Sequence, residues 1–98
     1  MKIPKTLKIG GKKIKVRAIK KIKGAENENV IGLWDVGNYK ITLQKNDIMP
    51  DGKLEECFLH EIIEAINGLY ELKLSHYKIT LMSEVLFQII KDNKLDFN

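Results

Sequence analysis

The residue types best suited to chemistry lie in one short stretch, His60-Glu61-Ile62-Ile63-Glu64. If this stretch is helical, His60 and Glu64 project from the same face one turn apart, because residues i and i+4 of an α-helix are neighbours. Both side chains can then reach one metal ion. Glu61 points about 100° away from His60, so it can flank that ion without binding it. The spacing therefore predicts a metallohydrolase site, in which a carboxylate takes a proton from metal-bound water.

The roles of these residues follow from the chemistry of a bound divalent ion. Zn²⁺ can lower the pKa of its water to about 7, so a neighbouring carboxylate can deprotonate that water near neutral pH. Glu61 is the predicted general base, and His60 and Glu64 are predicted ligands. A carboxylate at position 64 weakens the preference for zinc, so the expected cofactor is Zn²⁺ or another divalent metal. The alternative is a helix with a solvated acidic face and no metal.

A catalytic metal needs a third protein ligand, and two residues further along the chain are candidates. His76 offers an imidazole and Glu84 a carboxylate. The two lie roughly 12 Å apart along a helix axis, so both cannot easily bind one ion. His76 is preferred because, with Glu64 already anionic, a neutral donor leaves more of the positive charge available for catalysis. Tyr70 and Tyr77 have hydroxyls that could stabilise an oxyanion, although each is better explained as a half-buried aromatic.

The first half of the chain has the two-residue alternation of strands. Gly10-Gly11 suits a tight turn, and the flanking alternation predicts a first hairpin with strands at 6–9 and 12–19. A polar loop is expected at 20–29. A second hairpin is predicted around Gly37-Asn38, with strands at 30–36 and 39–43. The first half is thus expected to form a small antiparallel sheet of two hairpins.

The apolar period becomes helical after Pro50-Asp51-Gly52. It predicts one helix over 53–70, which carries the metal motif, and a second over 76–92. Ser75 is a suitable N-cap for the second helix. The fold class expected is α+β, with the sheet followed by two C-terminal helices, and residues 1–98 are taken as one domain with a small core.

Charge is distributed unevenly along the chain. Residues 1–25 hold ten of the 17 lysines and arginines and none of the 13 acids. Alternation places several of these cations on one exposed face of the first hairpin, namely Lys8, Lys13, Lys15 and Arg17. This basic hairpin is either a solvated sheet face or a phosphate-binding surface. It has neither interleaved aromatics nor a base-reading helix, which disfavours nucleic acid as the partner.

Hydropathy and cysteine content indicate where in the cell the protein is expected. No apolar run approaches the roughly 18 to 20 residues of a membrane span, and residues 1–23 lack the apolar segment of a secretory signal. A cytoplasmic location without membrane contact is therefore expected. The only cysteine, Cys57, cannot form an internal disulfide and is interpreted as a small apolar residue on a helix face. The sequence leaves the oligomeric state open.

Over its whole length the chain resembles the small zincin-like metallopeptidases encoded by phages and prophages. The similarity is most specific in the helix motif, Phe58-Leu59-His60-Glu61-Ile62-Ile63-Glu64-Ala65-Ile66-Asn67. It extends to Ile3-Pro4-Lys5, Ile9-Gly10-Gly11-Lys12, Gly32, Asp35, Ile41-Thr42-Leu43, Leu72-Lys73-Leu74-Ser75-His76, Ile79, Leu86-Phe87-Gln88 and Asp92-Asn93. The resemblance implies a minimal zincin core in which a sheet edge beside the motif helix holds an extended peptide by strand addition.

Carried over to this chain, the resemblance makes His60 the first ligand and Glu61 the base. Glu64 departs from the pattern, because many relatives have a second histidine there. The leading hypothesis is a zinc-dependent peptidase that acts on a peptide or protein in the cytoplasm of a bacterial host. Two alternatives stand beside it: a nucleic-acid-binding regulatory module that uses the basic hairpin, and a catalytically inactive zincin-like interaction protein that the departure at Glu64 makes credible.

Overall fold

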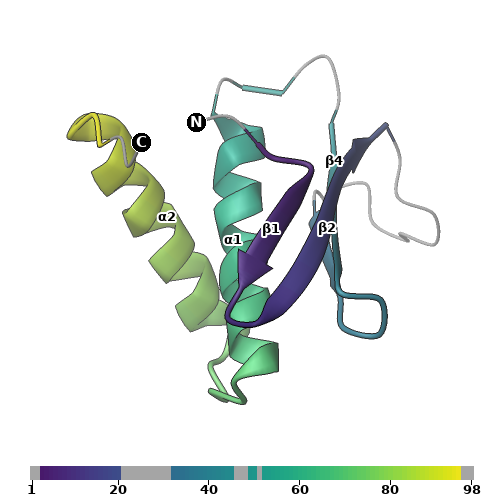
Figure 1. The fold of residues 1–98 in the computed structure, drawn as a ribbon. Coiled ribbons are helices and arrows are strands. Elements are labelled where there is room, and N and C mark those ends of the chain that lie inside the picture. The colour runs from purple at the N-terminus through teal and green to yellow at the C-terminus, as the bar shows by residue number, and fades with distance from the viewer. Residues whose placement is uncertain (1–2, 21–31, 46–48, 51, 96–98) are drawn as a thin grey trace.

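The structure is a computed structural model, and it describes residues 3–20, 32–45, 49–50 and 52–95. In this part of the chain, four strands are followed by two helices (Figure 1). The elements are β1 (Thr6–Ile9), β2 (Lys12–Ile19), β3 (Gly32–Asp35), β4 (Lys40–Gln44), α1 (Lys53–Leu69) and α2 (His76–Asp92). The predicted α+β fold class, with two hairpins ahead of two helices, is confirmed.

The four strands form one mixed sheet in the order β1-β2-β4-β3. Within each hairpin the pairing is antiparallel, with Leu7 opposite Ile14 and Trp34 opposite Ile41. The two hairpins join through β2 and β4, which pair in parallel with Val16 opposite Ile41. The prediction of an antiparallel sheet is therefore correct within the hairpins and wrong at their junction. Parallel neighbours need a long crossover, and here β3 occupies the outer edge so that β4 can return beside β2.

The strand bounds agree closely with the sequence pattern, with differences in the second hairpin. β3 ends at Asp35 rather than at residue 36, and residues 30 and 31 of its expected range lie outside the described residues. β4 begins at Lys40 because Tyr39 has a φ of 49°, which is incompatible with an extended strand. Apart from its first residue, the loop expected at 20–29 also lies outside the described residues.

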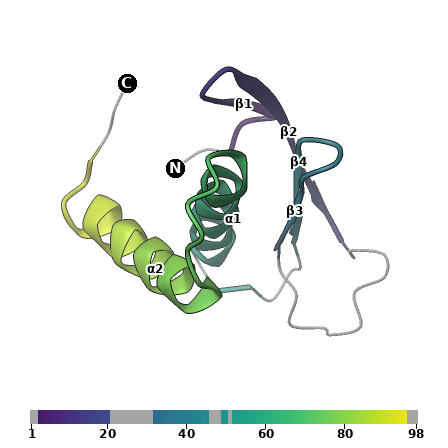
Figure 2. The same ribbon diagram turned by 90° about the horizontal axis from the view of Figure 1, so that it is seen from below.

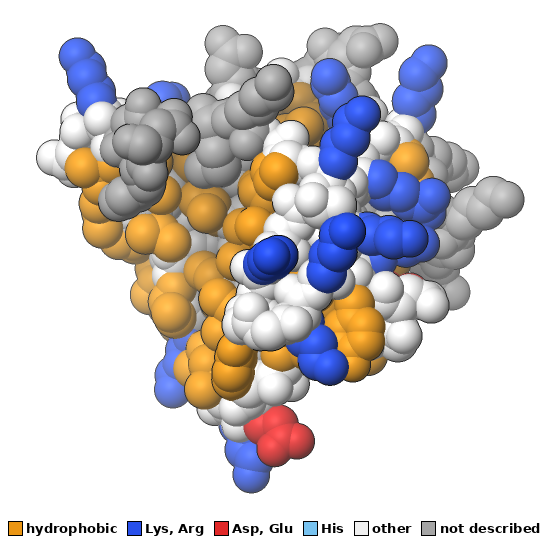
Figure 3. Space-filling model, in the orientation of Figure 1, with side chains coloured by type: hydrophobic (Ala, Val, Ile, Leu, Met, Phe, Trp, Pro, Cys, Tyr) orange, Lys and Arg blue, Asp and Glu red, His pale blue; other side chains and the backbone are white. Residues whose placement is uncertain are grey.

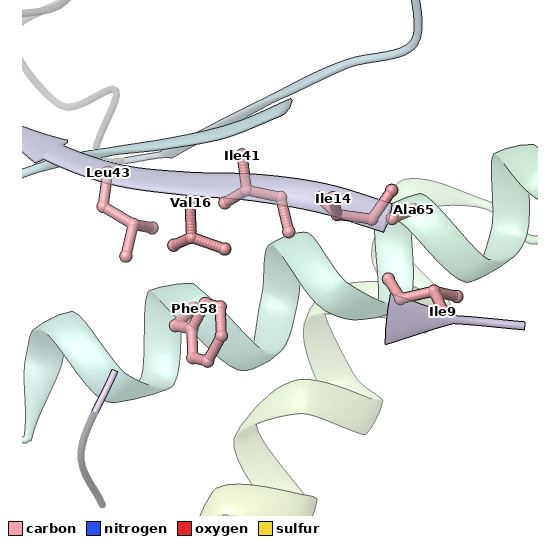
Figure 4. Packing of buried hydrophobic residues seen from close by; sticks show 7 residues of the cluster. All are labelled: Ile9, Ile14, Val16, Ile41, Leu43, Phe58 and Ala65. Carbon is pink, nitrogen blue, oxygen red and sulfur yellow. The ribbon is translucent and has the colours of Figure 1, made fainter. Parts of the chain in front are cut away.

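Both helices lie on the same side of the sheet (Figure 2). α1 packs on β3 and β4, and its buried face shares one core with the inward residues of β2 and β4 (Figure 4). The core cluster consists of Ile9, Ile14, Val16, Ile41, Leu43, Phe58 and Ala65. Burying an aliphatic or aromatic side chain of this size contributes about 1.5 to 3 kcal/mol. This cluster fixes the motif helix against the sheet.

Among the described elements, the second helix packs mainly on the first. Its buried residues are Ile79 and Ser83, and it begins after Ser75, whose hydroxyl accepts a hydrogen bond from the backbone N–H of Lys78 at 3.2 Å. The predicted N-cap is thus confirmed. α1 ends at Leu69, one residue earlier than predicted. Among the residues described, neither helix is long and apolar enough to cross a membrane.

Candidate metal centre

Three potential ligand atoms converge where α1 lies beside the start of α2. His60, Glu64 and His76 each offer one atom, and these atoms lie within 4.8 Å of one another. In a tetrahedral zinc site with bonds of about 2.0 to 2.2 Å, ligand atoms stand roughly 3.3 to 3.5 Å apart. The three groups therefore need to close by only about 1 to 1.5 Å to surround an ion. The structure brings together the three residues that the sequence predicts as ligands.

The link between the two helices, residues 70–75, places His76 beside His60. Asn67 holds this link, because its side-chain oxygen accepts a hydrogen bond from Leu74 N at 2.8 Å and its carbonyl accepts one from Leu72 N at 3.1 Å. His76, the first residue of α2, then meets His60 edge to face, with ring centroids 5.1 Å apart and an interplanar angle of 65°. Convergence of the two imidazoles thus depends on a polar side chain near the end of α1.

The two histidines open onto a cleft of about 440 Å³ between α1, α2 and β3. Its lining residues are Gly32, Lys53, Glu56, Cys57, His60, Glu61, His76, Thr80, Ser83 and Glu84. Glu64 is half-buried and is not among them, so the candidate metal position lies at the rim of the cleft. This volume falls within the usual range of small-ligand pockets, roughly 300 to 1,000 Å³. It has room for part of a peptide next to the metal position.

Ser83 is the buried polar neighbour of His60. Its hydroxyl donates to the carbonyl of Thr80 at 2.9 Å, and its oxygen lies 3.5 Å from His60 Nδ1. With its own proton engaged, the Ser83 oxygen is available to accept from the His60 tautomer that carries its proton on Nδ1. In that tautomer Nε2 has no proton and can bind a metal. Burial also lowers the pKa of His60, an effect that the adjacent His76 reinforces and that Glu64 opposes.

Glu61 is buried, with 8% of its surface exposed, and faces β3. A Cβ atom at Gly32 would come within 2.7 Å of Glu61 Oε2, so the carboxyl group lies directly against the backbone of this strand. Burial, assisted by the charge of Glu64, raises the pKa of Glu61 from 4.5 to about 7. A carboxyl group with a pKa near neutrality can accept a proton and give it back at physiological pH.

Other residues singled out in the sequence have different positions. Glu84 lines the same cleft, but its carboxylate does not belong to the converging group. Tyr70 has its hydroxyl against Gly10, where a Cβ would collide with it, and Tyr77 is 74% exposed. Neither tyrosine is among the residues lining the cleft. Trp34 is partly buried against the core.

Asp35 and Cys57 have local structural explanations. The Asp35 carboxylate accepts hydrogen bonds from Gly37 N at 3.1 Å, Asn38 N at 3.3 Å and Asn38 Nδ2 at 2.8 Å. These bonds close the β3–β4 turn and lower the pKa of Asp35. Cys57 is half-buried on α1, and burial raises the pKa of its thiol.

Two residues of the site did not emerge from sequence reasoning as site residues. Ser83 follows His76 by seven residues, a separation that places both on one helix face and could have drawn attention to it. Gly32 gave no chemical signal, because its role is to leave room for Glu61.

Together, two imidazoles, one carboxylate and a nearby carboxyl group with a pKa near neutrality match the donor types of catalytic zinc sites that keep a fourth position for water. Compared with known proteins, the chain matches no family model, no curated protein and no solved structure.

Proposed function

We propose that this protein is a zincin-like, metal-dependent peptidase, of the phage or prophage type indicated by the sequence resemblance, acting in the cytoplasm of a bacterial host. The observation that carries the proposal is the convergence of His60, Glu64 and His76 within 4.8 Å beside the buried carboxyl group of Glu61. Zn²⁺ is the cofactor that two imidazoles and one carboxylate fit best, and another divalent metal remains compatible with Glu64.

The replacement of a second motif histidine by Glu64 is offset by His76. The donor set still contains two neutral imidazoles and one carboxylate, so a bound divalent ion keeps a net positive charge for catalysis. Compared with a motif that has both histidines on one helix, only the order of the histidine and glutamate ligands along the chain differs. The retained positive charge favours an active site over a catalytically inactive relic.

The protein groups divide the work of amide hydrolysis. A bound metal would supply Lewis acidity toward water and the substrate carbonyl. Glu61 would accept the proton of the attacking water as oxygen bonds to the carbonyl carbon, and would deliver it to the departing amine as the C–N bond breaks. The Ser83 hydroxyl would hold the His60 ring in its ligating tautomer. Gly32 would let the substrate-side strand approach the proton-transfer group.

The sheet provides a place for an extended peptide. Among the described strands, β3 has β4 as its only neighbour, and Gly32 at its start lines the cleft. A peptide paired with this edge by strand addition would run past Glu61, which touches β3 at Gly32. The proposed substrate is therefore an extended segment of a peptide or protein.

Metal content of purified variants tests the proposal. After zinc loading and dialysis, the wild type should retain one equivalent of metal, and His60→Ala, His76→Ala and Glu64→Ala should lose it. Glu84→Ala is the matched control, because it removes a carboxylate from the same cleft but not from the converging group. Cleavage of a peptide library should then require metal and stop with a chelator. Equal zinc in the wild type and His60→Ala would overturn the proposal.

A second candidate function is supported by the open face of the sheet. Lys8 lies directly opposite Lys13, and Lys15 directly opposite Lys40, although like charges in these positions repel each other. Lysine and arginine side chains gather over β1 and β2, on the surface away from the helices (Figure 3). A phosphate backbone bound there would relieve the repulsion, and its affinity would fall steeply with salt. Gel-shift titration at low and physiological salt, with Lys13→Glu as the comparison, tests this alternative.

A further inference from the structure

The outer side of α2 carries a continuous set of large apolar side chains. Each is between 40% and 48% exposed: Leu81, Met82, Val85, Leu86 and Ile89. They extend around the helix from the margin of its buried face to the side opposite Ile79 and Ser83. Figure 3 shows hydrophobic side chains gathered over this helix. Single exposed apolar residues are ordinary, but a contiguous apolar patch marks a contact surface.

The charges at the two ends of this surface indicate what covers it. Lys78 lies seven residues before Val85 and Asp92 seven residues after it, and both are exposed. Together with Leu81 and Ile89 they follow the spacing of a single helical stripe, centred on Val85. The stripe is therefore basic at its N-terminal end, apolar in the middle and acidic at its C-terminal end.

Such a stripe is complementary to itself when two copies run antiparallel. About a twofold axis through Val85, Leu81 faces the partner subunit's Ile89, and Lys78 faces the partner subunit's Asp92. Two opposite-charge pairs form, one at each end of an apolar centre. A parallel arrangement would instead place like charges together at both ends. The charge pattern thus selects both the kind of partner and its direction.

We propose that a second copy of this chain covers the outer face of α2, in a twofold dimer whose α2 helices run antiparallel and cross at Val85. A shallow crossing of about 20° keeps Lys78 and the partner subunit's Asp92 close, since they lie only about 10 Å along the axis from the crossing point. One 17-residue helix offers less area than the roughly 800 Å² per partner of a strong dimer, so the dissociation constant is expected in the micromolar range.

The dimer leaves the candidate metal centre open. The cleft-lining residues of α2 are His76, Thr80, Ser83 and Glu84, and they lie on the sides of the helix away from the Leu81–Val85–Ile89 stripe. The dimer proposal therefore stands or falls independently of the proposed peptidase activity.

Charge reversal gives the first test. Analytical ultracentrifugation of the wild type should show a concentration-dependent dimer. Lys78→Asp and Asp92→Lys should each raise the dissociation constant about tenfold or more, because each converts two attractive contacts into two repulsive ones. The double variant should return it close to the wild-type value. Lys91→Asp is the matched control, since it reverses a lysine on the same helix outside the stripe, and it should leave the constant unchanged.

Cysteine cross-linking gives the second test and reports the register. In a Cys57→Ser background, Val85→Cys should form a disulfide dimer under mild oxidation, because this residue meets itself at the axis. Ile89→Cys alone should not, since its two copies would lie about 12 Å apart along the helices, beyond the reach of a disulfide. A mixture of Leu81→Cys and Ile89→Cys chains should cross-link.

Three results would overturn the proposal. The first is a wild type that stays monomeric up to millimolar concentration. The second is a double charge reversal that restores nothing, and the third is cross-linking of Ile89→Cys as efficient as that of Val85→Cys. A monomer that co-sediments with phosphatidylglycerol vesicles through Val85 would assign the face to a membrane surface and would equally reject the dimer.

Discussion

Replacing Glu61 by glutamine removes a buried ionisable group while keeping the shape of the side chain. The folded protein holds the pKa of Glu61 at about 7, against an ordinary value of 4.5, mainly because burial disfavours the charged form. Between these two pH values the native state binds more protons than the unfolded chain. The stability of the wild type should therefore fall as pH rises through this window, and the glutamine variant should lack this loss.

The size of the effect follows from the same pair of values. A difference from 4.5 to about 7 corresponds to about 3 kcal/mol, reached above pH 7 and absent below pH 4.5. In a domain of this length, a stabilisation of that size raises the melting temperature by more than about 10 °C. The apoprotein carrying Glu61→Gln should thus be clearly more stable than the wild type at alkaline pH and nearly equal to it in acid.

Urea unfolding in the presence of a chelator measures this difference directly. The two proteins are compared below pH 4.5, within the window and above pH 7, so that other titrating groups cancel. Glu71→Gln, at an exposed position after α1, controls for the general effect of removing a carboxylate. A stability difference between wild type and Glu61→Gln that is the same at every pH would contradict the raised pKa of Glu61. Metal-loaded Glu61→Gln should still bind zinc while losing about 10²- to 10⁴-fold in hydrolysis.

Three further outcomes are expected. Gly32→Ala places a Cβ within 2.7 Å of Glu61 Oε2 and should reduce peptide cleavage without removing the metal. Gly37→Ala, in the same hairpin, is the control: the nearest atom to its new Cβ would be 3.5 Å away, so cleavage should be unchanged. Ser83→Ala should lower zinc affinity about 10- to 100-fold in a competition titration, with partial rescue by threonine, because a hydroxyl that orients a ligating imidazole is lost. Cys57 should react slowly with iodoacetamide at neutral pH and quickly once the protein is unfolded, since burial raises the pKa of its thiol; rapid reaction of the folded protein would contradict this.

Local features of the fold could be predicted from the sequence because each has a local cause. The alternation of lysines with Ile14 and Val16 defined β2 to the residue, and the Ser75 cap with its following helical period defined the start of α2. The pairing of β2 with β4 could not be predicted in this way. Period-2 alternation indicates which face of a strand is buried, but it does not indicate which strand lies beside it or in which direction.

In the candidate site, too, the features with a local cause could be predicted and those that depend on distant segments could not. Stacking of His60 and Glu64 follows from helical geometry alone, and the choice of His76 over Glu84 followed from charge. Whether His76 actually reaches the motif depends on the conformation of the link that Asn67 holds, which no periodicity encodes. The burial of Glu61 likewise arises from the packing of α1 against β3, a contact between segments distant in sequence.

All three candidate ligands belong to the pair of helices, whereas Glu61 is the group that touches the sheet. In the proposed peptidase, ion binding and proton transfer would therefore depend on two different packing surfaces. Substitutions that loosen β3 would abolish peptide cleavage but leave a protein that still binds the metal. Substitutions in the link between the two helices would abolish both cleavage and metal binding. Descendants of such a chain would accordingly lose catalysis before they lose the ion, and a partially unfolded state that keeps only the helical hairpin would still be expected to hold it.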